Sequence, residues 1–127
     1  MSYYISRRVD GSFEEVVDRT VAALEEQGFG VLTDIDIKAT MHAKLGVDFR
    51  PYRILGACNP PFAHQALLAE DKIGTMLPCN VVVQQLDSGV EIAAVDPLAS
   101  MQAVENPNLG EIAQEVRERL RAAVEAA

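Results

Sequence analysis

Hydrophobic residues recur along this chain with two different periods. A period of two indicates strands, and a period of three to four indicates helices. A period of two, typical of strands, runs through residues 2–8, 29–37 and 90–95. Residues 52–58 and 80–86 are also predicted as strands, the latter because continuous valines are typical of a strand that is buried on both faces. The pattern therefore predicts five strands.

Helical spacing of apolar residues predicts two long helices, one near each end of the chain. The first covers residues 13–24: Ser12 and Glu15 fit a capping box before it, and Gly28 supplies a left-handed stop after it. The second follows the Asn-Pro-Asn stretch at 106–108 and runs to the C-terminus. Its apolar stripe consists of Leu109, Ile112, Ala113, Val116, Leu120 and Val124.

Two shorter helices are predicted between the strands. Apolar side chains four positions apart favour a short helix over residues 38–46. Asn59-Pro60-Pro61 is a helix-start signature, and we expect the Asn59 side chain to cap a helix over residues 62–71.

These elements predict the fold class and the domain organisation. A chain of 127 residues is long enough for one hydrophobic core, and it shows no repeat and no linker. We therefore expect a single domain over residues 1–127. The fold class is α+β, with a five-stranded, mostly antiparallel sheet and the long N- and C-terminal helices on one face.

Charge and composition exclude two classes of partner. The formal net charge is −8, whereas nucleic acids and anionic membranes are both bound through Lys and Arg. No apolar run approaches the roughly 20 residues of a membrane-spanning helix, and residues 1–8 lack the features of a signal peptide. We expect no nucleic-acid or membrane partner, a cytoplasmic location and reduced cysteines.

The two cysteines have the most specific surroundings of any reactive residues in the chain. Cys58 ends a predicted strand just before a proline-started helix, whose N-terminal amides would lower the thiol pKa. Cys79 follows Pro78 in a loop that enters the valine-rich strand. If the third and fourth strands are neighbours, the two thiols can lie close together and form one site. Both cysteines can also be small hydrophobes that only pack.

A histidine and two methionines could join this site. His64 could act as a base toward Cys58 or as a metal ligand, although Cys-x5-His is not a recognised zinc signature. Met76 and Met101 are soft donors near the same loops, and thioether together with thiolate suits copper(I). The alternative is that both methionines fill gaps in the core.

Arg50 and Arg53 belong to a cluster of charged and aromatic residues over 48–53. Two guanidinium groups can bind an anionic ligand in a bidentate manner. The same residues can instead form a surface ion-pair network of little energetic value. The chain shows no Gly-rich phosphate loop, HExxH motif or nucleophile elbow that would indicate a more specific chemistry.

Three segments of the chain resemble the signatures of one family. Residues 44–61, the Leu-Pro-Cys-Asn-Val-Val-Val stretch at 77–83, and Asp96-Pro97 are similar to signatures of domain of unknown function 302, a bacterial and archaeal family. The resemblance covers essentially the whole chain. It implies a TBP-like fold with a β-α-β(4)-α core and a helical insertion after strand three, and it implies a homodimer. It implies no established activity.

The first functional hypothesis is a binding or sulfur-handling module. It would take a small molecule, a thiol species or a metal at a cysteine-lined site formed by Cys58 and Cys79. Asn59, Arg50 and Arg53 are further candidates for ligand binding. The cofactor is unknown.

Three alternatives stay open from the sequence. A thiol-disulfide or sulfur-transfer enzyme would use Cys58 as nucleophile, Cys79 as resolving thiol and His64 as base. A metal-binding protein would use both cysteines with either His64 or Met76. A structural or interaction module would use its cysteines for packing only.

Overall fold

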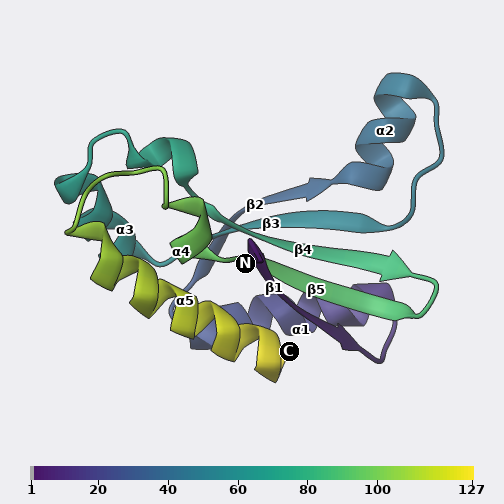
Figure 1. The fold of residues 1–127 in the computed structure, drawn as a ribbon. Coiled ribbons are helices and arrows are strands. Elements are labelled where there is room, and N and C mark those ends of the chain that lie inside the picture. Colours follow the sequence, from purple (N-terminus) through teal and green to yellow (C-terminus); the bar gives the residue numbers. More distant parts are fainter. Residues whose placement is uncertain (1) are drawn as a thin grey trace.

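The structure is a computed structural model that describes residues 2–127. One five-stranded sheet runs through it in the order β1-β5-β4-β3-β2 (Figure 1), and all neighbouring strands are antiparallel. The strands are β1 (Tyr4–Val9), β2 (Gly30–Asp36), β3 (Tyr52–Cys58), β4 (Cys79–Leu86) and β5 (Gly89–Val95). The predicted α+β class and all five predicted strands are confirmed.

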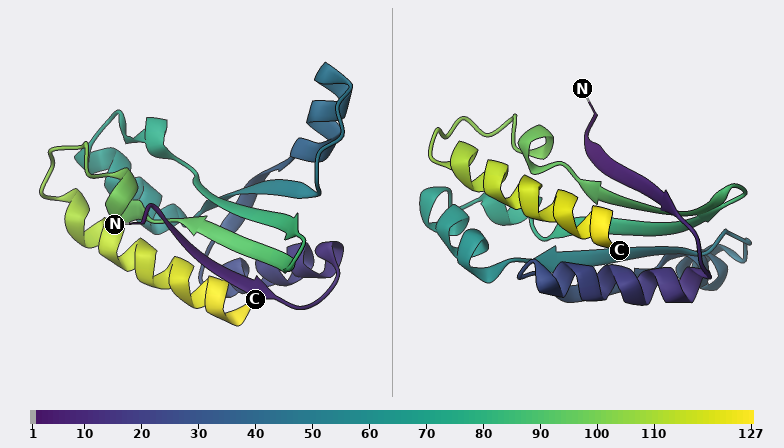
Figure 2. Two further views of the ribbon diagram at one scale, coloured as in Figure 1. Left: turned by 45° about the vertical axis from the view of Figure 1, so that its right-hand side comes forward. Right: turned by 90° about the horizontal axis from the view of Figure 1, so that it is seen from below.

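Two long helices pack side by side on one face of the sheet (Figures 1 and 2). They are α1 (Phe13–Glu26) and α5 (Leu109–Ala126), and both are predicted by their apolar spacing. The shorter helical segments are α2 (Ile37–Leu45), α3 (Pro60–Ala69), the 3₁₀ turn η1 (Ile73–Met76) and α4 (Pro97–Ser100). The sequence pattern does not predict η1 or α4, which have only four residues each. No helix among the described residues is long and apolar enough to cross a membrane.

The hydrophobic core lies between the sheet and the two long helices. Alternate residues of the central strands face these helices and are fully buried; they include Leu55, Val81, Val83 and Ile92. We call the opposite side of the sheet the open face. Val82 lies on it and is only half-buried. The prediction that β4 is buried on both faces is therefore wrong for a single chain.

A bulge in β2 changes which side chains face the core. The pairing with β3 shifts between Val31 and Thr33, so that Leu32 is the extra residue. Because side chains alternate along a strand, this extra residue turns Thr33 and Ile35 toward the open face. Phe29 is buried, whereas Ile35 is 46% exposed. The alternation that predicts this strand therefore does not mark one continuous buried face.

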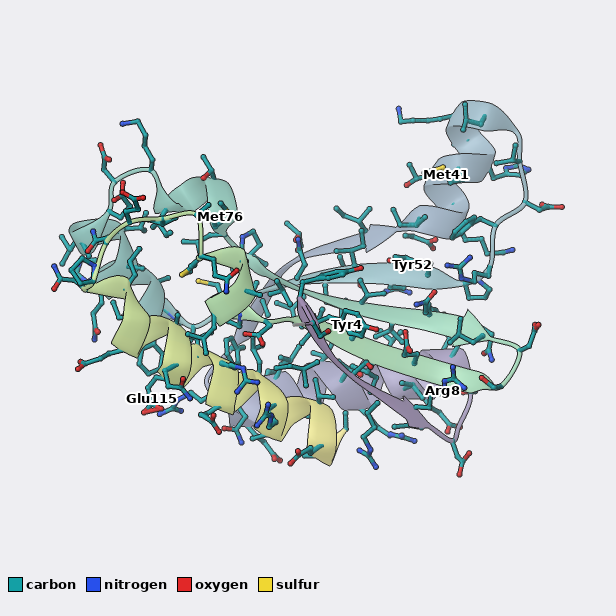
Figure 3. The ribbon with its side chains drawn as sticks, in the orientation of Figure 1. Tyr4, Arg8, Met41, Tyr52, Met76 and Glu115 are labelled. Atoms are coloured by element: carbon teal, nitrogen blue, oxygen red, sulfur yellow. The ribbon has the colours of Figure 1, made fainter. Side chains whose placement is uncertain are left out.

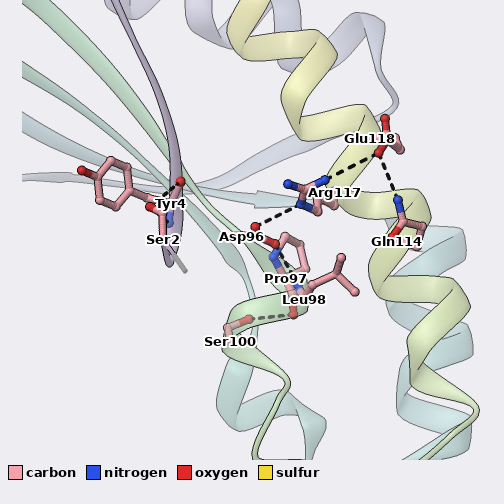
Figure 4. A network of polar contacts seen from close by, with 9 residues as sticks. All are labelled: Ser2, Tyr4, Asp96, Pro97, Leu98, Ser100, Gln114, Arg117 and Glu118. Atoms are coloured by element: carbon pink, nitrogen blue, oxygen red, sulfur yellow. Dashed lines mark hydrogen bonds and ion pairs between the residues drawn. The ribbon is translucent and has the colours of Figure 1, made fainter.

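Asp96 ties the end of β5 to α5 (Figure 4). Its Oδ1 accepts a hydrogen bond from the Leu98 amide at 3.0 Å, and its Oδ2 accepts one from Arg117 Nε at 3.0 Å. Asp96 is buried, so this carboxylate depends on both partners to offset the loss of water. The two bonds hold α4, whose C-cap is Met101, beside α5.

Replacing Asp96 by alanine should destabilise the fold strongly. The change removes the hydrogen-bonded carboxylate of the half-buried Arg117 guanidinium and leaves it only the longer contact to Glu118, 3.7 Å from its Nη1. We therefore expect a loss of about 3 kcal/mol in the free energy of unfolding. Urea denaturation measures it. The control is Asp71→Ala, since the Asp71–Lys72 pair is exposed and its loss should change stability by no more than about 0.5 kcal/mol. An equal effect of the two changes would contradict this role of Asp96.

Candidate functional site

The pairing of β3 with β4 brings the two cysteines to the same end of the sheet. Ala57 lies directly opposite Cys79, and Cys58 is the next residue along β3. Both cysteines line one pocket, together with Met101 from the end of α4. We call this pocket the sulfur pocket. The condition set by the sequence, that strands three and four are neighbours, is therefore met.

The sulfur pocket is small and apolar. It lies where β3 ends and β4 begins, and side chains of α3 and α5 complete its wall. Its larger apolar residues are Phe29, Phe62, Leu77, Ile112 and Val116. Its volume is about 30 Å³, enough for about two water-sized spheres. It has room for one ion or one added heavy atom, whereas drug-sized ligands occupy sites of roughly 300 Å³ or more.

The two thiols have different environments. Cys79 faces the helix-covered side and is 8% exposed. Burial, and to a smaller extent the charge of Cys58, raise the pKa of the Cys79 thiol to about 11. Cys58 is half-buried and is the last residue of β3. It therefore lies at the rim of the sulfur pocket, where the chain leaves the sheet for α3.

Both cysteines are free thiols in the structure. Successive side chains of a regular strand point to opposite faces of the sheet. Since Ala57 is the residue opposite Cys79, the strand geometry aims the Cys58 side chain away from the face that Cys79 occupies. A disulfide between the two cysteines would therefore require the backbone at Cys58 to turn.

Asn59 occupies the predicted N-cap position of α3, but its side chain does not cap this helix. Its Nδ2 instead donates a hydrogen bond to the Gln27 carbonyl at 3.2 Å, and Arg119 Nη1 donates to the same oxygen at 3.4 Å. Gln27 is the C-cap residue of α1, whose last carbonyls lack partners within the helix. The prediction of capping is wrong because the Asn59 amide serves this carbonyl. The bond ties the rim of the sulfur pocket to α1.

Gly56 allows the loop before Cys79 to lie against β3. A Cβ at this position would lie 2.8 Å from Pro78 Cγ and would overlap the Thr33 hydroxyl. Glycine in a strand often marks such a close approach. The missing side chain therefore lets Pro78 lie beside β3 and places Cys79 at the start of β4.

His64 and Met76 do not line the sulfur pocket. His64 is exposed on α3, and Met76 is 38% exposed at the end of η1 (Figure 3). Met101 is the methionine that the fold brings to the cysteines. Within residues 2–127, no three or more His, Cys, Asp or Glu side chains are grouped so that they could hold a metal ion.

Arg53 lies away from the sulfur pocket and is engaged in ion pairs. Its Nε donates to Asp34 Oδ1 at 2.7 Å, and Glu14 lies 3.8 Å from its Nη1. The hydrogen bond to Arg53 lowers the pKa of Asp34, and the same bond raises the pKa of Arg53. Of the two alternatives that the sequence suggests for Arg53, anion binding and a surface ion-pair network, these contacts agree with the ion-pair network.

Arg50 also lies away from the two cysteines. Its Nε donates to Gln84 Oε1 at 2.9 Å, and its guanidinium carbon lies 4.5 Å from the centre of the Phe49 ring. Gln84 in turn donates to Glu91 at 3.0 Å on the open face. The candidate residues thus divide into a sulfur pocket, with Cys58, Asn59 and Cys79, and two separate groups of polar contacts, one around Arg53 and one around Arg50.

Comparison with known proteins identifies the family. The family model described as domain of unknown function DUF302 matches residues 5–127. The chain belongs to the DUF302 family. A solved structure, of an uncharacterized conserved DUF302 protein from Bacillus stearothermophilus, is similar with a TM-score of 0.93 and 30% identity, covering 99% of this chain and 98% of that one. No curated protein matches. The family resemblance seen in the sequence is confirmed, and the DUF302 match extends over nearly the whole fold.

Alkaline pH should destabilise this DUF302 protein through Cys79. Folding raises the pKa of this thiol from about 9 to about 11, so the unfolded state loses the proton first. The contribution of the protonated Cys79 thiol to the free energy of unfolding is therefore complete below pH 9 and is lost as the pH rises to 11. Two pKa units correspond to about 3 kcal/mol. We expect urea denaturation to show this extra loss in the wild type but not in Cys79→Ala.

The matched control is Cys58→Ala, which keeps the buried thiol and should keep most of the wild-type pH dependence. Identical pH dependence in the wild type and in Cys79→Ala would contradict the assignment.

Proposed function

We propose that this DUF302 protein is a thiol-dependent binding module whose sulfur pocket takes one small, soft species in a reducing compartment such as the cytoplasm. One observation carries the proposal. Cys58 and Cys79, 21 positions apart in the sequence, end and begin neighbouring strands and line the same pocket. Packing alone explains the buried Cys79, but it does not explain why a second cysteine, the half-buried Cys58, lies at the rim.

The two thiols would have different roles. Cys58 is the accessible group at the rim and would meet the incoming species first. Cys79 forms the inner wall, where burial keeps its thiol protonated until a partner replaces the proton. The small volume supports a ligand no larger than one ion or one added heavy atom.

A thiol-disulfide enzyme has less support. Such an enzyme needs a reversible disulfide between Cys58 and Cys79, yet Ala57 is the residue opposite Cys79. His64, the candidate base, is exposed on α3 and does not line the pocket. A binding role requires neither the disulfide nor the base.

Thiol reactivity tests the proposed function. The reduced native protein is mixed with a chromogenic aromatic disulfide at neutral pH, and the released aromatic thiolate is followed by absorbance. We expect one thiol of the wild type to react in the native state and the second only after unfolding. Cys58→Ala should abolish the native-state reaction, and Cys79→Ala should retain it. Two thiols that both stay silent until unfolding would overturn the proposal.

We also propose that the protein is a homodimer that uses α2 and the open face. No residue of α2 is buried, and α2 rises from the sheet on the side away from α1 and α5 (Figure 2). Leu45 is 70% exposed and Leu32 is 66% exposed. The valine run of β4 favours burial on both faces, yet a single chain covers only one. A second copy would cover these apolar side chains by an isologous contact.

The double variant Leu32→Glu/Leu45→Glu should weaken this dimer at least tenfold, about 1.4 kcal/mol, because it places carboxylates in the proposed contact. Sedimentation velocity at several concentrations measures the change. The matched control is Leu68→Glu, which alters an equally exposed leucine on α3 and should leave the association unchanged. A monomeric wild type, or equal weakening by the control, would contradict the proposal.

A further inference from the structure

A groove on the open face of the sheet shares no residue with the sulfur pocket. Its volume is about 370 Å³, whereas sites for drug-sized ligands start at roughly 300 Å³. Tyr3, Tyr4 and Tyr52 line it, and these are all three tyrosines of the chain. We call it the tyrosine groove. It is large enough for a small organic molecule and offers that molecule aromatic surface.

The floor of the tyrosine groove is apolar in the middle and polar at one end. Val82 and Ala93 lie opposite each other in the register of β4 and β5, and both are half-buried. Two positions further along each strand, Gln84 lies opposite Glu91. Because the Ala93 side chain is small, the floor is lowest between the larger side chains at the two ends.

Tyr4 marks the other end of the groove, since it lies opposite Val95 in the register of β1 and β5. An antiparallel strand rises roughly 3.4 Å per residue, so Glu91 and Val95 lie about 14 Å apart along β5. The Tyr3 ring packs edge-on against the Tyr4 ring, with 5.0 Å between the ring centres. The groove therefore fits an elongated molecule, with a polar head at Glu91 and an apolar body that extends toward Tyr4.

Glu91 supplies a carboxylate without a cationic partner. Gln84 Nε2 donates to Glu91 Oε1 at 3.0 Å, and Gln84 Oε1 accepts from Arg50 Nε at 2.9 Å. Within residues 2–127, no Lys or Arg forms an ion pair with Glu91, not even Arg8, which lies opposite it in the register of β1 and β5. A half-buried carboxylate whose hydrogen bond comes from a neutral amide is stabilised by an opposite charge.

The surroundings of Glu91 also favour a positively charged head. Tyr52 lies opposite Gln84 and so belongs to the same row of the sheet as Glu91. The face of a tyrosine ring attracts cations, and the Arg50 guanidinium carbon already lies 5.5 Å from the centre of the Tyr52 ring. Arg50 itself does not line the groove. The formal net charge of −8 further favours the approach of cations over anions.

We propose that the tyrosine groove is a binding site for a small organic cation, an ammonium or guanidinium group on an elongated apolar body, with Glu91 as its counter-ion. The apolar body lies on Val82 and Ala93 and ends against Tyr3 and Tyr4. This inference goes beyond the thiol-dependent module, because it uses neither cysteine. The site belongs to one chain and needs no second copy.

Three probes with the same body and different heads test the charge that the groove selects. They are phenylbutylamine, phenylbutanol and phenylbutyrate, which carry an ammonium, a hydroxyl and a carboxylate. The chain has no tryptophan and all its tyrosines line the groove, so intrinsic tyrosine emission reports binding there. We expect the ammonium to bind roughly tenfold more tightly than the alcohol, because it makes a charge-assisted hydrogen bond, and the carboxylate to bind most weakly. Equal affinities for the three probes, or no binding of the ammonium, would overturn the proposal.

A matched pair of variants locates the counter-ion. Glu91→Gln removes the charge but keeps an oxygen that can accept from Gln84, and it should weaken ammonium binding roughly tenfold while leaving the alcohol unaffected. Glu115→Gln removes the same charge from the exposed side of α5 (Figure 3) and should leave both affinities unchanged. Equal effects of the two changes would assign the selectivity to the overall charge and overturn the site.

Ala93→Leu tests the position of the apolar body. Its side chain fills the floor of the groove on the open face, away from the core, and should weaken ammonium binding roughly tenfold or more by overpacking. Circular dichroism confirms that the variant is folded. Unchanged binding by Ala93→Leu would place the probe outside the groove and overturn the proposal.

The last comparisons separate this site from the sulfur pocket and from the proposed dimer. Cys58→Ala should bind the ammonium as the wild type does, and a loss of binding in that variant would contradict a site independent of the cysteines. Leu32→Glu/Leu45→Glu changes side chains of β2 and α2 that do not line the groove and should also bind it. A wild type that binds no probe, while this double variant does, would show that a second copy fills the groove and overturn the ligand site.

Discussion

The register between β3 and β4 is the constraint on which the rest of this structure depends. Because side chains alternate along a strand, a slip of one residue would exchange the buried and open faces of either strand. Leu55, Val81 and Val83 are fully buried, so such a slip would expose part of the core. The same register sets Ala57 opposite Cys79 and leaves Cys58 at the rim. The position of the sulfur pocket is therefore a consequence of core packing.

Polar contacts at the edges of the helical layer hold the other walls of the pocket. Asn59 and Arg119 both donate to the Gln27 carbonyl, which links α3 and α5 to the end of α1. On the other side, Asp96 joins α4 to α5 through Arg117 and so holds Met101 near the cysteines. These bonds satisfy groups that burial would otherwise leave without partners. These bonds therefore fix the walls of the sulfur pocket.

The sequence predicts the elements well but only part of the site. Strands, long helices and the positions of both cysteines follow from local spacing, which reports the face of each element that is buried. Three features depend on distant residues and were not predictable: the bulge at Leu32, the bond from Asn59 to α1, and the choice of Met101 over Met76. Asn59 illustrates the reason, since a capping residue fits the local pattern but the carbonyl it serves lies 32 positions away.

The central claim is that Cys58 and Cys79 share one small pocket, and cross-linking of thiols tests it most directly. Dibromobimane becomes strongly fluorescent only when two thiols displace both of its bromides. Reaction with the reduced native protein, followed by peptide mass spectrometry, should show one bridge within the chain that joins Cys58 to Cys79. Separate capping of the two cysteines, or bridges only between different chains, would contradict the account.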